Sequence, residues 1–147
     1  MLKTLKNDIM AKANKYFNVD ELVSKEVYEL LGDNAIKLID TRLLKVIEEI
    51  RELLGVPLIC NNWMHGGSRN NCGYRDLNCT IGASKSAHKD GMAADLISVK
   101  MSAADMRKKI LANKDKISYP IRIEDDVTWL HVDVRNTKND SIYLFKA

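Results

Sequence analysis

Two stretches in the first third of the chain repeat apolar residues at the spacing of an amphipathic helix. The first covers residues 20–31, with Asp20 placed to cap its start and Gly32 to end it. The second begins near residue 33 and continues to Gly55. Both helices are predicted to pack one apolar stripe on a core: Leu22, Val23, Val27, Leu30 and Leu31, then Ile36, Ile39, Leu43, Val46, Ile47, Ile50 and Leu54.

Beyond Pro57 the apolar residues come in short runs that are typical of strands. One more helix is predicted at 102–114, with Ser102 as its cap, and the glycine-rich segment 61–87 reads as a long loop. Strands are expected at 57–60, 93–99, 117–123, 127–135 and 141–145. Helices that precede strands predict an α+β fold, in which N-terminal helices pack on a mainly antiparallel sheet.

The chain reads as a single domain, residues 1–147. Within it we distinguish an N-terminal extension, 1–16, a helical part, 17–56, and a part made of sheet and loops, 57–147. A length of 147 residues is enough to bury a core without disulfides. The three cysteines match neither a zinc ribbon nor a redox pair, so we expect small buried side chains.

Charge and hydropathy exclude several classes of function. A net charge of +3 without a long basic run argues against a nucleic-acid partner. No apolar stretch is long enough to span a membrane, and the N-terminus lacks the apolar core of a secretory signal. We therefore expect a protein that is synthesised in the cytoplasm. We also expect a monomer.

Alternation along residues 127–135 separates two faces of one strand. Leu130, Val132 and Val134 fall on a core face, whereas the other face carries Trp129, His131, Asp133 and Arg135. Such a row of imidazole, carboxylate and guanidinium is either a solvated face with an ion pair or part of a site.

A second group of polar residues favours the site. His88 and Asp95 lie seven positions apart across Gly91, which permits a backbone bend, and Asp95 is in phase with apolar strand positions. A carboxylate in such a position needs a neutralising partner, and a divalent metal provides one. With His131 arriving from the later strand, the three residues form a His-Asp-His set suited to zinc.

The pattern Ser86-x-His88-x-x-Gly91-x-Ala93-x-Asp95, followed by Trp129-x-His131-x-Asp133, resembles the zinc D-Ala-D-Ala peptidases. That family belongs to a superfamily with the lysostaphin-type enzymes and the hedgehog signalling domain. The segment around Asn61, Trp63 and Gly73-Tyr74-Arg75 is similar to its phage and prophage branch, so the resemblance extends from about Phe17 to the C-terminus.

The resemblance implies roles for individual residues. The zinc ligands would be His88, Asp95 and His131. Arg75 would bind a substrate carboxylate or carbonyl; otherwise it is a surface arginine beside Asp76. Ser86 would contact substrate or a ligand, or simply close a turn.

The general base departs from the family pattern. Several relatives carry a glutamate three residues before the last histidine, where this chain has Thr128. Glu124 is our choice of base, with Asp125 and Asp126 as neighbouring alternatives in what could be an acidic turn. Asp133 is a further alternative, and it is better suited to orient an imidazole or to pair with Arg135.

Together these residues imply a zinc metallopeptidase that cleaves peptide bonds in peptidoglycan stem peptides or cross-links, as an endolysin or a carboxypeptidase does. Without a secretory signal, a phage or prophage enzyme that reaches the wall after release is expected. The alternative is a zinc-binding or virion-associated domain of the same fold that does not catalyse. His65 either borders the substrate groove or is a surface histidine.

Overall fold

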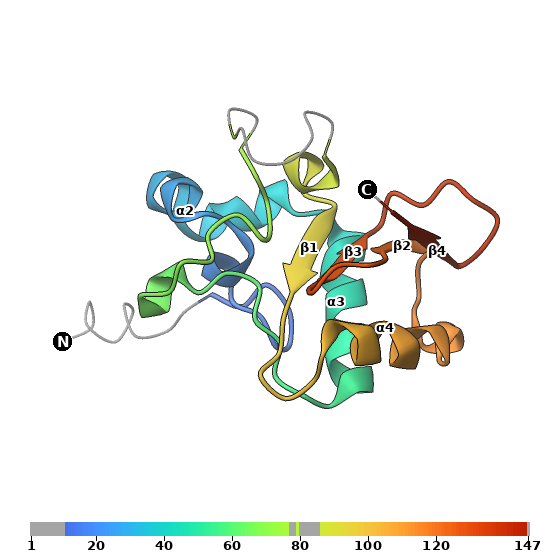
Figure 1. Cartoon of the computed structure of the whole chain (residues 1–147). Coiled ribbons are helices and arrows are strands. Elements are labelled where there is room, and N and C mark those ends of the chain that lie inside the picture. The colour runs from blue at the N-terminus through green and yellow to red at the C-terminus, as the bar shows by residue number, and fades with distance from the viewer. Residues whose placement is uncertain (1–10, 77–78, 80–85, 147) are drawn as a thin grey trace.

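The computed structural model describes residues 11–76, 79 and 86–146 (Figure 1). Its α-helices are α2 (Lys25–Leu31), α3 (Thr41–Leu54) and α4 (Ala103–Leu111). Its strands are β1 (Ala93–Leu96), β2 (Ile121–Glu124), β3 (Leu130–Asp133) and β4 (Ile142–Phe145). Short 3-10 helices are η1 (Val19–Leu22), η2 (Gly32–Leu38), η3 (Trp63–His65), η4 (Ala87–Asp90) and η5 (Lys114–Lys116).

The first predicted helix is shorter than expected. Asp20 lies inside η1 rather than at a helix cap, and Ser24 caps α2 by accepting a hydrogen bond from the Val27 amide at 3.2 Å. The apolar spacing continues through both pieces, so periodicity alone could not show the break. The expected stripe is also partly wrong, because Leu30 is 81% exposed and Leu31 39% exposed.

The second predicted helix is also divided. Residues 33–38 belong to η2, and α3 starts only after Asp40, whose carboxylate accepts a hydrogen bond from the Arg42 amide at 2.8 Å. The predicted end at Gly55 is confirmed, with φ at +69°. The buried face of α3 matches the predicted stripe and consists of Leu43, Val46, Ile47, Ile50 and Leu54.

The sheet has the order β1-β3-β2-β4. The β1–β3 and β3–β2 pairs are antiparallel and the β2–β4 pair is parallel, so the expected α+β fold with a mainly antiparallel sheet is confirmed. Segment 57–60 is not a strand; Ile59 makes only an isolated bridge with Ile97. The strand predicted at 93–99 ends at Leu96, and Val99 is 86% exposed.

The core lies between the sheet and α3, which runs behind β1 and β3 in Figure 1. Leu96, Leu130 and Val132 contribute to it from the sheet. The predicted cap Ser102 is confirmed: its Oγ accepts a hydrogen bond from the Asp105 amide at 3.1 Å. Within residues 11–76 and 86–146, the helices are too short and too polar to cross a lipid bilayer.

Gly91 forms a tight turn between η4 and β1. Its φ is +68°, and a Cβ atom added there would lie 1.8 Å from the carbonyl oxygen of Leu38. Its own carbonyl accepts a hydrogen bond from the Asp40 amide at 2.9 Å. This turn therefore fixes β1 against the start of α3, as only glycine allows.

Gly91→Ala is expected to lower the free energy of unfolding by about 2–5 kcal/mol, because it adds a clash to left-handed backbone strain. Gly55→Ala is the matched control, since Gly55 has a similar φ of +69° but nothing within 4 Å of its added Cβ. We expect about 1 kcal/mol there. Urea unfolding of both variants measures the difference, and equal losses would show that the Leu38 contact is unimportant.

Candidate metal centre

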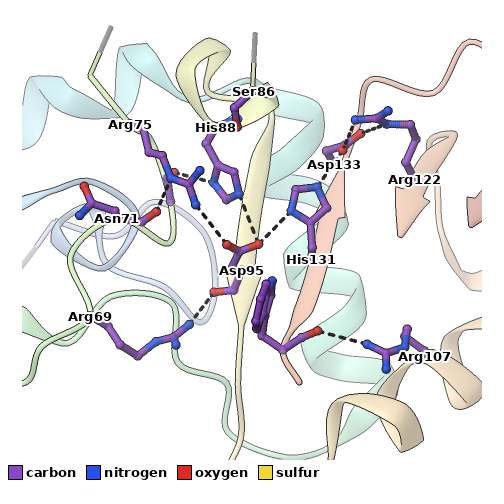
Figure 2. A network of polar contacts seen from close by, with 12 residues as sticks. Arg69, Asn71, Arg75, Ser86, His88, Asp95, Arg107, Arg122, His131 and Asp133 are labelled. Atoms are coloured by element: carbon purple, nitrogen blue, oxygen red, sulfur yellow. Dashed lines mark hydrogen bonds and ion pairs between the residues drawn. The ribbon is translucent and has the colours of Figure 1, made fainter. Parts of the chain in front are cut away.

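The structure brings His88, Asp95 and His131 together from three separate elements (Figure 2). His88 lies in η4, Asp95 in β1 and His131 in β3. The antiparallel register makes Asp95 and His131 direct cross-strand partners, on the face of the sheet opposite to α3. All three residues are buried, and one donor atom from each lies within 4.8 Å of the others.

His88 is held so that one ring nitrogen faces Asp95. Ser86 caps η4 by accepting a hydrogen bond from the His88 amide at 3.3 Å. The Nδ1 atom of His88 lies 2.9 Å from the carbonyl oxygen of Gly73, which can only accept, so Nδ1 carries the hydrogen. Nε2, 3.3 Å from Asp95 Oδ1, is therefore the nitrogen whose lone pair His88 can offer to a metal once Nε2 is deprotonated.

His131 is oriented from the other side by Asp133. Its Nε2 lies 2.9 Å from Asp133 Oδ2 and its Nδ1 lies 2.9 Å from Asp95 Oδ1. Asp133 is fully buried and accepts two hydrogen bonds from Arg122, at 2.9 and 2.8 Å. The predicted orienting role of Asp133 therefore has a geometric basis, and Nδ1 is the nitrogen that His131 could offer to a metal.

The charges in this cluster stabilise one another. Burial alone would raise the pKa of Asp95, but its hydrogen bonds to His131 and His88 hold that pKa well below its usual range. Burial would lower the pKa of His131, and Asp133 and Asp95 outweigh this effect and raise it to about 9. Burial would raise the pKa of Asp133, but its hydrogen bonds to His131 and Arg122 lower that pKa to about 2.

The donor set fits a tetrahedral metal such as zinc. Ligand atoms about 2.0–2.2 Å from zinc are about 3.3–3.6 Å apart in a tetrahedron. Asp95 Oδ1 lies 3.3 Å from His88 Nε2, and its 2.9 Å separation from His131 Nδ1 is slightly below that range. Three buried N and O donors would leave a fourth position for another ligand, so the cluster could hold a metal ion.

The predicted substrate-binding residues both lie at this cluster. Arg75 donates from Nε to the Asn71 carbonyl at 2.7 Å, and its Nη2 lies 3.4 Å from Asp95 Oδ2. Arg75 thus turns towards Asp95, and its side chain is 11% exposed. Ser86 closes the turn before His88, which was the second interpretation given to it.

The carboxylates considered as the general base differ in their surroundings. Glu124 ends β2 two residues after Arg122, so it lies on the sheet face that carries the cluster. Asp125 instead lies 3.7 Å from Arg107, and Asp126 lies 3.6 Å from Lys146. Glu124 is therefore the member of the acidic turn that strand alternation directs to the cluster.

Other predicted features lie outside the cluster. His65 is exposed at the end of η3. The three cysteines are free thiols, with Cys60 buried and Cys72 and Cys79 partly buried. Within the loop predicted at 61–87, residues 77–78 and 80–85 lie outside the described part of the chain.

Two arginines at the cluster were missed by sequence reasoning. Arg122 donates two hydrogen bonds to Asp133, for which the sequence offered Arg135 as one alternative partner; the backbone amide of Arg135 also donates to Asp133, at 3.1 Å. Arg69 donates to the carbonyl oxygens of Cys60 and Asp95, at 2.7 and 3.0 Å, and so ties the loop to β1. Neither contact has a local signal, since each depends on a partner at least nine positions away.

Metal binding at pH 7 is expected to release about one proton. His131 is protonated below its pKa of about 9, and a metal needs the Nδ1 lone pair. The apparent affinity for zinc should therefore rise about tenfold per pH unit between pH 7 and 9, then level off. Calorimetry in buffers of different ionisation enthalpy measures the release. His65→Gln should behave like the wild type, and binding without proton release would contradict this protonation state.

Comparison of the chain with protein-family models, curated proteins and solved structures gives no match. The resemblance to zinc D-Ala-D-Ala peptidases therefore rests on the motif residues alone. What the structure adds is the buried His-Asp-His cluster that could hold a metal ion.

Proposed function

We propose that this protein is a zinc-dependent peptidase that cleaves peptide bonds in the stem peptides or cross-links of bacterial peptidoglycan. The observation that carries the proposal is the buried cluster of His88, Asp95 and His131, in which Gly73 and Asp133 fix the two imidazoles from outside. Such outer partners are typical of built metal sites. The peptide specificity comes from the motif resemblance, which covers both carboxypeptidases and endopeptidases.

In the proposed site, zinc would be held by His88 Nε2, an Asp95 carboxylate oxygen and His131 Nδ1. When bound, zinc would lower the pKa of a water molecule and polarise a substrate carbonyl. The surrounding protein contributes orientation, since both histidine rings are fixed by a second hydrogen bond.

Glu124 is the proposed general base. It would accept a proton from the attacking water and return it to the amine nitrogen of the leaving group. Its place at the end of β2 supports this role, because the alternation that puts Arg122 beside Asp133 puts Glu124 on the same face, towards His131.

Arg75 is the proposed anchor for the substrate. Its guanidinium is planar and permanently charged, which suits a carboxylate or a carbonyl oxygen of the peptide. Its Nε donates to the carbonyl oxygen of Asn71, which orients the guanidinium. Its Nη2 makes only a long contact with Asp95, at 3.4 Å.

A non-catalytic zinc-binding or virion-associated domain is the second candidate. Thr128, an exposed residue before β3, stands where several peptidases of this kind carry their glutamate. A zinc site without a base would serve stability or partner binding, and the cluster would then be structural.

Removal of the metal tests the proposal. The purified protein is expected to contain about one zinc per chain and to release amines from peptidoglycan. A chelator should abolish the release, and zinc should restore it. At a zinc concentration a thousandfold above Kd, binding adds about 4 kcal/mol, which raises Tm by about 8–16 °C in a protein of this size.

Elemental analysis, amine release and thermal unfolding separate the candidates. Full zinc occupancy without hydrolysis of walls of different cross-link chemistry would favour the non-catalytic domain. A protein that binds zinc at far less than one ion per chain would contradict both.

A further inference from the structure

Trp129 carries a buried hydrogen-bond donor that the protein itself does not use. Within the described part of the chain, its indole Nε1 is covered from solvent and has no hydrogen-bond partner. The rest of the side chain is partly exposed, so the N–H edge is the part that points inward. A buried N–H without a partner is uncommon in folded proteins and costs about 1–3 kcal/mol.

The indole N–H of the other tryptophan, by contrast, has a hydrogen-bond partner within the protein. Trp63 Nε1 donates to the carbonyl oxygen of Val23 at 3.0 Å. The two further buried atoms without partners, Asn18 Oδ1 and Asp20 Oδ1, are acceptors near η1. Among these orphaned atoms of the described residues, Trp129 Nε1 is therefore the one donor.

The position of Trp129 in the sheet places its side chain on the same face as the cluster of His88, Asp95 and His131. Trp129 immediately precedes β3 and is two residues before His131, so alternation puts both side chains on the same face. Its carbonyl oxygen accepts a hydrogen bond from Arg107 Nη1 at 3.1 Å, which fixes the backbone at this point. The next residue, Leu130, faces the core and pairs with Leu96.

Apart from Arg75, the proposed charged anchor of the substrate, the polar side chains around the cluster already have partners, which leaves Trp129 as an additional, uncharged donor. His88 is bound to Gly73, His131 to Asp133, and Asp133 to Arg122. Beside Arg75, a ligand oxygen that arrives at the cluster would meet acceptors and donors that are already hydrogen-bonded. An indole N–H on the same face would satisfy such an oxygen and would itself gain a partner.

We propose that the indole N–H of Trp129 donates a hydrogen bond to a carbonyl or carboxylate oxygen of the peptide bound at the His-Asp-His cluster. The proposal rests on the proposed function, because it deepens the description of the same site. The N–H is covered in this structure, so the contact requires a side-chain rotation when the ligand binds, a change that is common at binding sites. Trp129 would thus be a substrate contact that is neither a metal ligand nor a charged group.

The test uses the two indole N–H signals of the ¹⁵N-labelled, zinc-loaded protein in NMR spectra. Acetohydroxamate is the probe, because it offers a carbonyl oxygen and binds zinc through its own oxygens. We expect the Trp129 signal to shift on saturation and the Trp63 signal to stay, since Trp63 is already bonded to Val23. Without zinc, neither signal should move. This measurement needs no variant and so does not depend on how a mutant folds.

A pair of variants measures the strength of the contact. Trp129→Phe keeps the aromatic ring and removes the N–H, and it should bind acetohydroxamate about threefold to tenfold more weakly at unchanged zinc content. Trp63→Phe is the matched control and should bind it as the wild type does. Unchanged affinity in Trp129→Phe, or an unmoved Trp129 signal while acetohydroxamate binds, would overturn this inference alone. Failure of the wild type to bind zinc would overturn the proposed function with it.

Discussion

Replacing His131 with alanine is expected to abolish the proposed zinc binding and the proposed peptidase activity together. The change removes one of the three proposed ligands and leaves two buried carboxylates, Asp95 and Asp133, without the imidazole between them. Zinc content should fall from about one ion per chain to a trace, and amine release by at least about a thousandfold, equivalent to about 4 kcal/mol. Loss of the imidazole is also expected to reduce the free energy of unfolding by about 3–5 kcal/mol.

Because that stability loss could unfold the protein, His131→Gln provides a second variant of similar volume. It should remain folded by circular dichroism and still lose zinc. His65→Ala is the matched control, since His65 is exposed at the end of η3 and should keep both zinc and activity. Zinc retained in folded His131→Gln would show that this histidine is not a ligand.

Replacing Glu124 with glutamine should lower the rate of peptide hydrolysis by about 10²–10⁴-fold while zinc content and Tm stay nearly unchanged. The amide keeps the size of the side chain but cannot accept the proton of the attacking water. Because the residue is only half-buried at the end of β2, no core packing is lost. Steady-state kinetics on purified peptidoglycan fragments should place the loss in kcat rather than in KM.

Asp125→Asn and Asp126→Asn are the matched controls for Glu124. Their carboxylates face Arg107 and Lys146, so these variants should retain most of the activity. Asp133→Asn is expected to weaken zinc binding by about 10–100-fold through His131, and saturating zinc should largely restore its activity. If Glu124→Gln kept full activity and Asp133→Asn lost it at saturating zinc, the assignment of the base would be wrong.

The sequence predicted the architecture more reliably than the limits of its elements. Apolar spacing identified the buried face of α3, and turn chemistry identified its end at Gly55. The breaks at Ser24 and Asp40 were missed, because 3-10 turns keep nearly the same apolar spacing as an α-helix. The parallel β2–β4 pair was also beyond reach, since strand order depends on tertiary packing.

The same division applies to the site. His88 and Asp95 could be recognised because they share one short motif, and His131 because its strand alternates clearly. Arg122 could not be found, since its role exists only through the β2–β3 register that sets it opposite Asp133. The N–H of Trp129 likewise shows its lack of a partner only when every acceptor near it has been placed.

The pairing of Asp95 with His131 has a kinetic consequence. These two side chains are 36 positions apart and meet only when β1 and β3 have joined in one register. A slip by a single residue would turn Asp95 into the core and dismantle the cluster. A metal would therefore recognise a chain that has already folded correctly, so it would slow unfolding far more than it would accelerate folding.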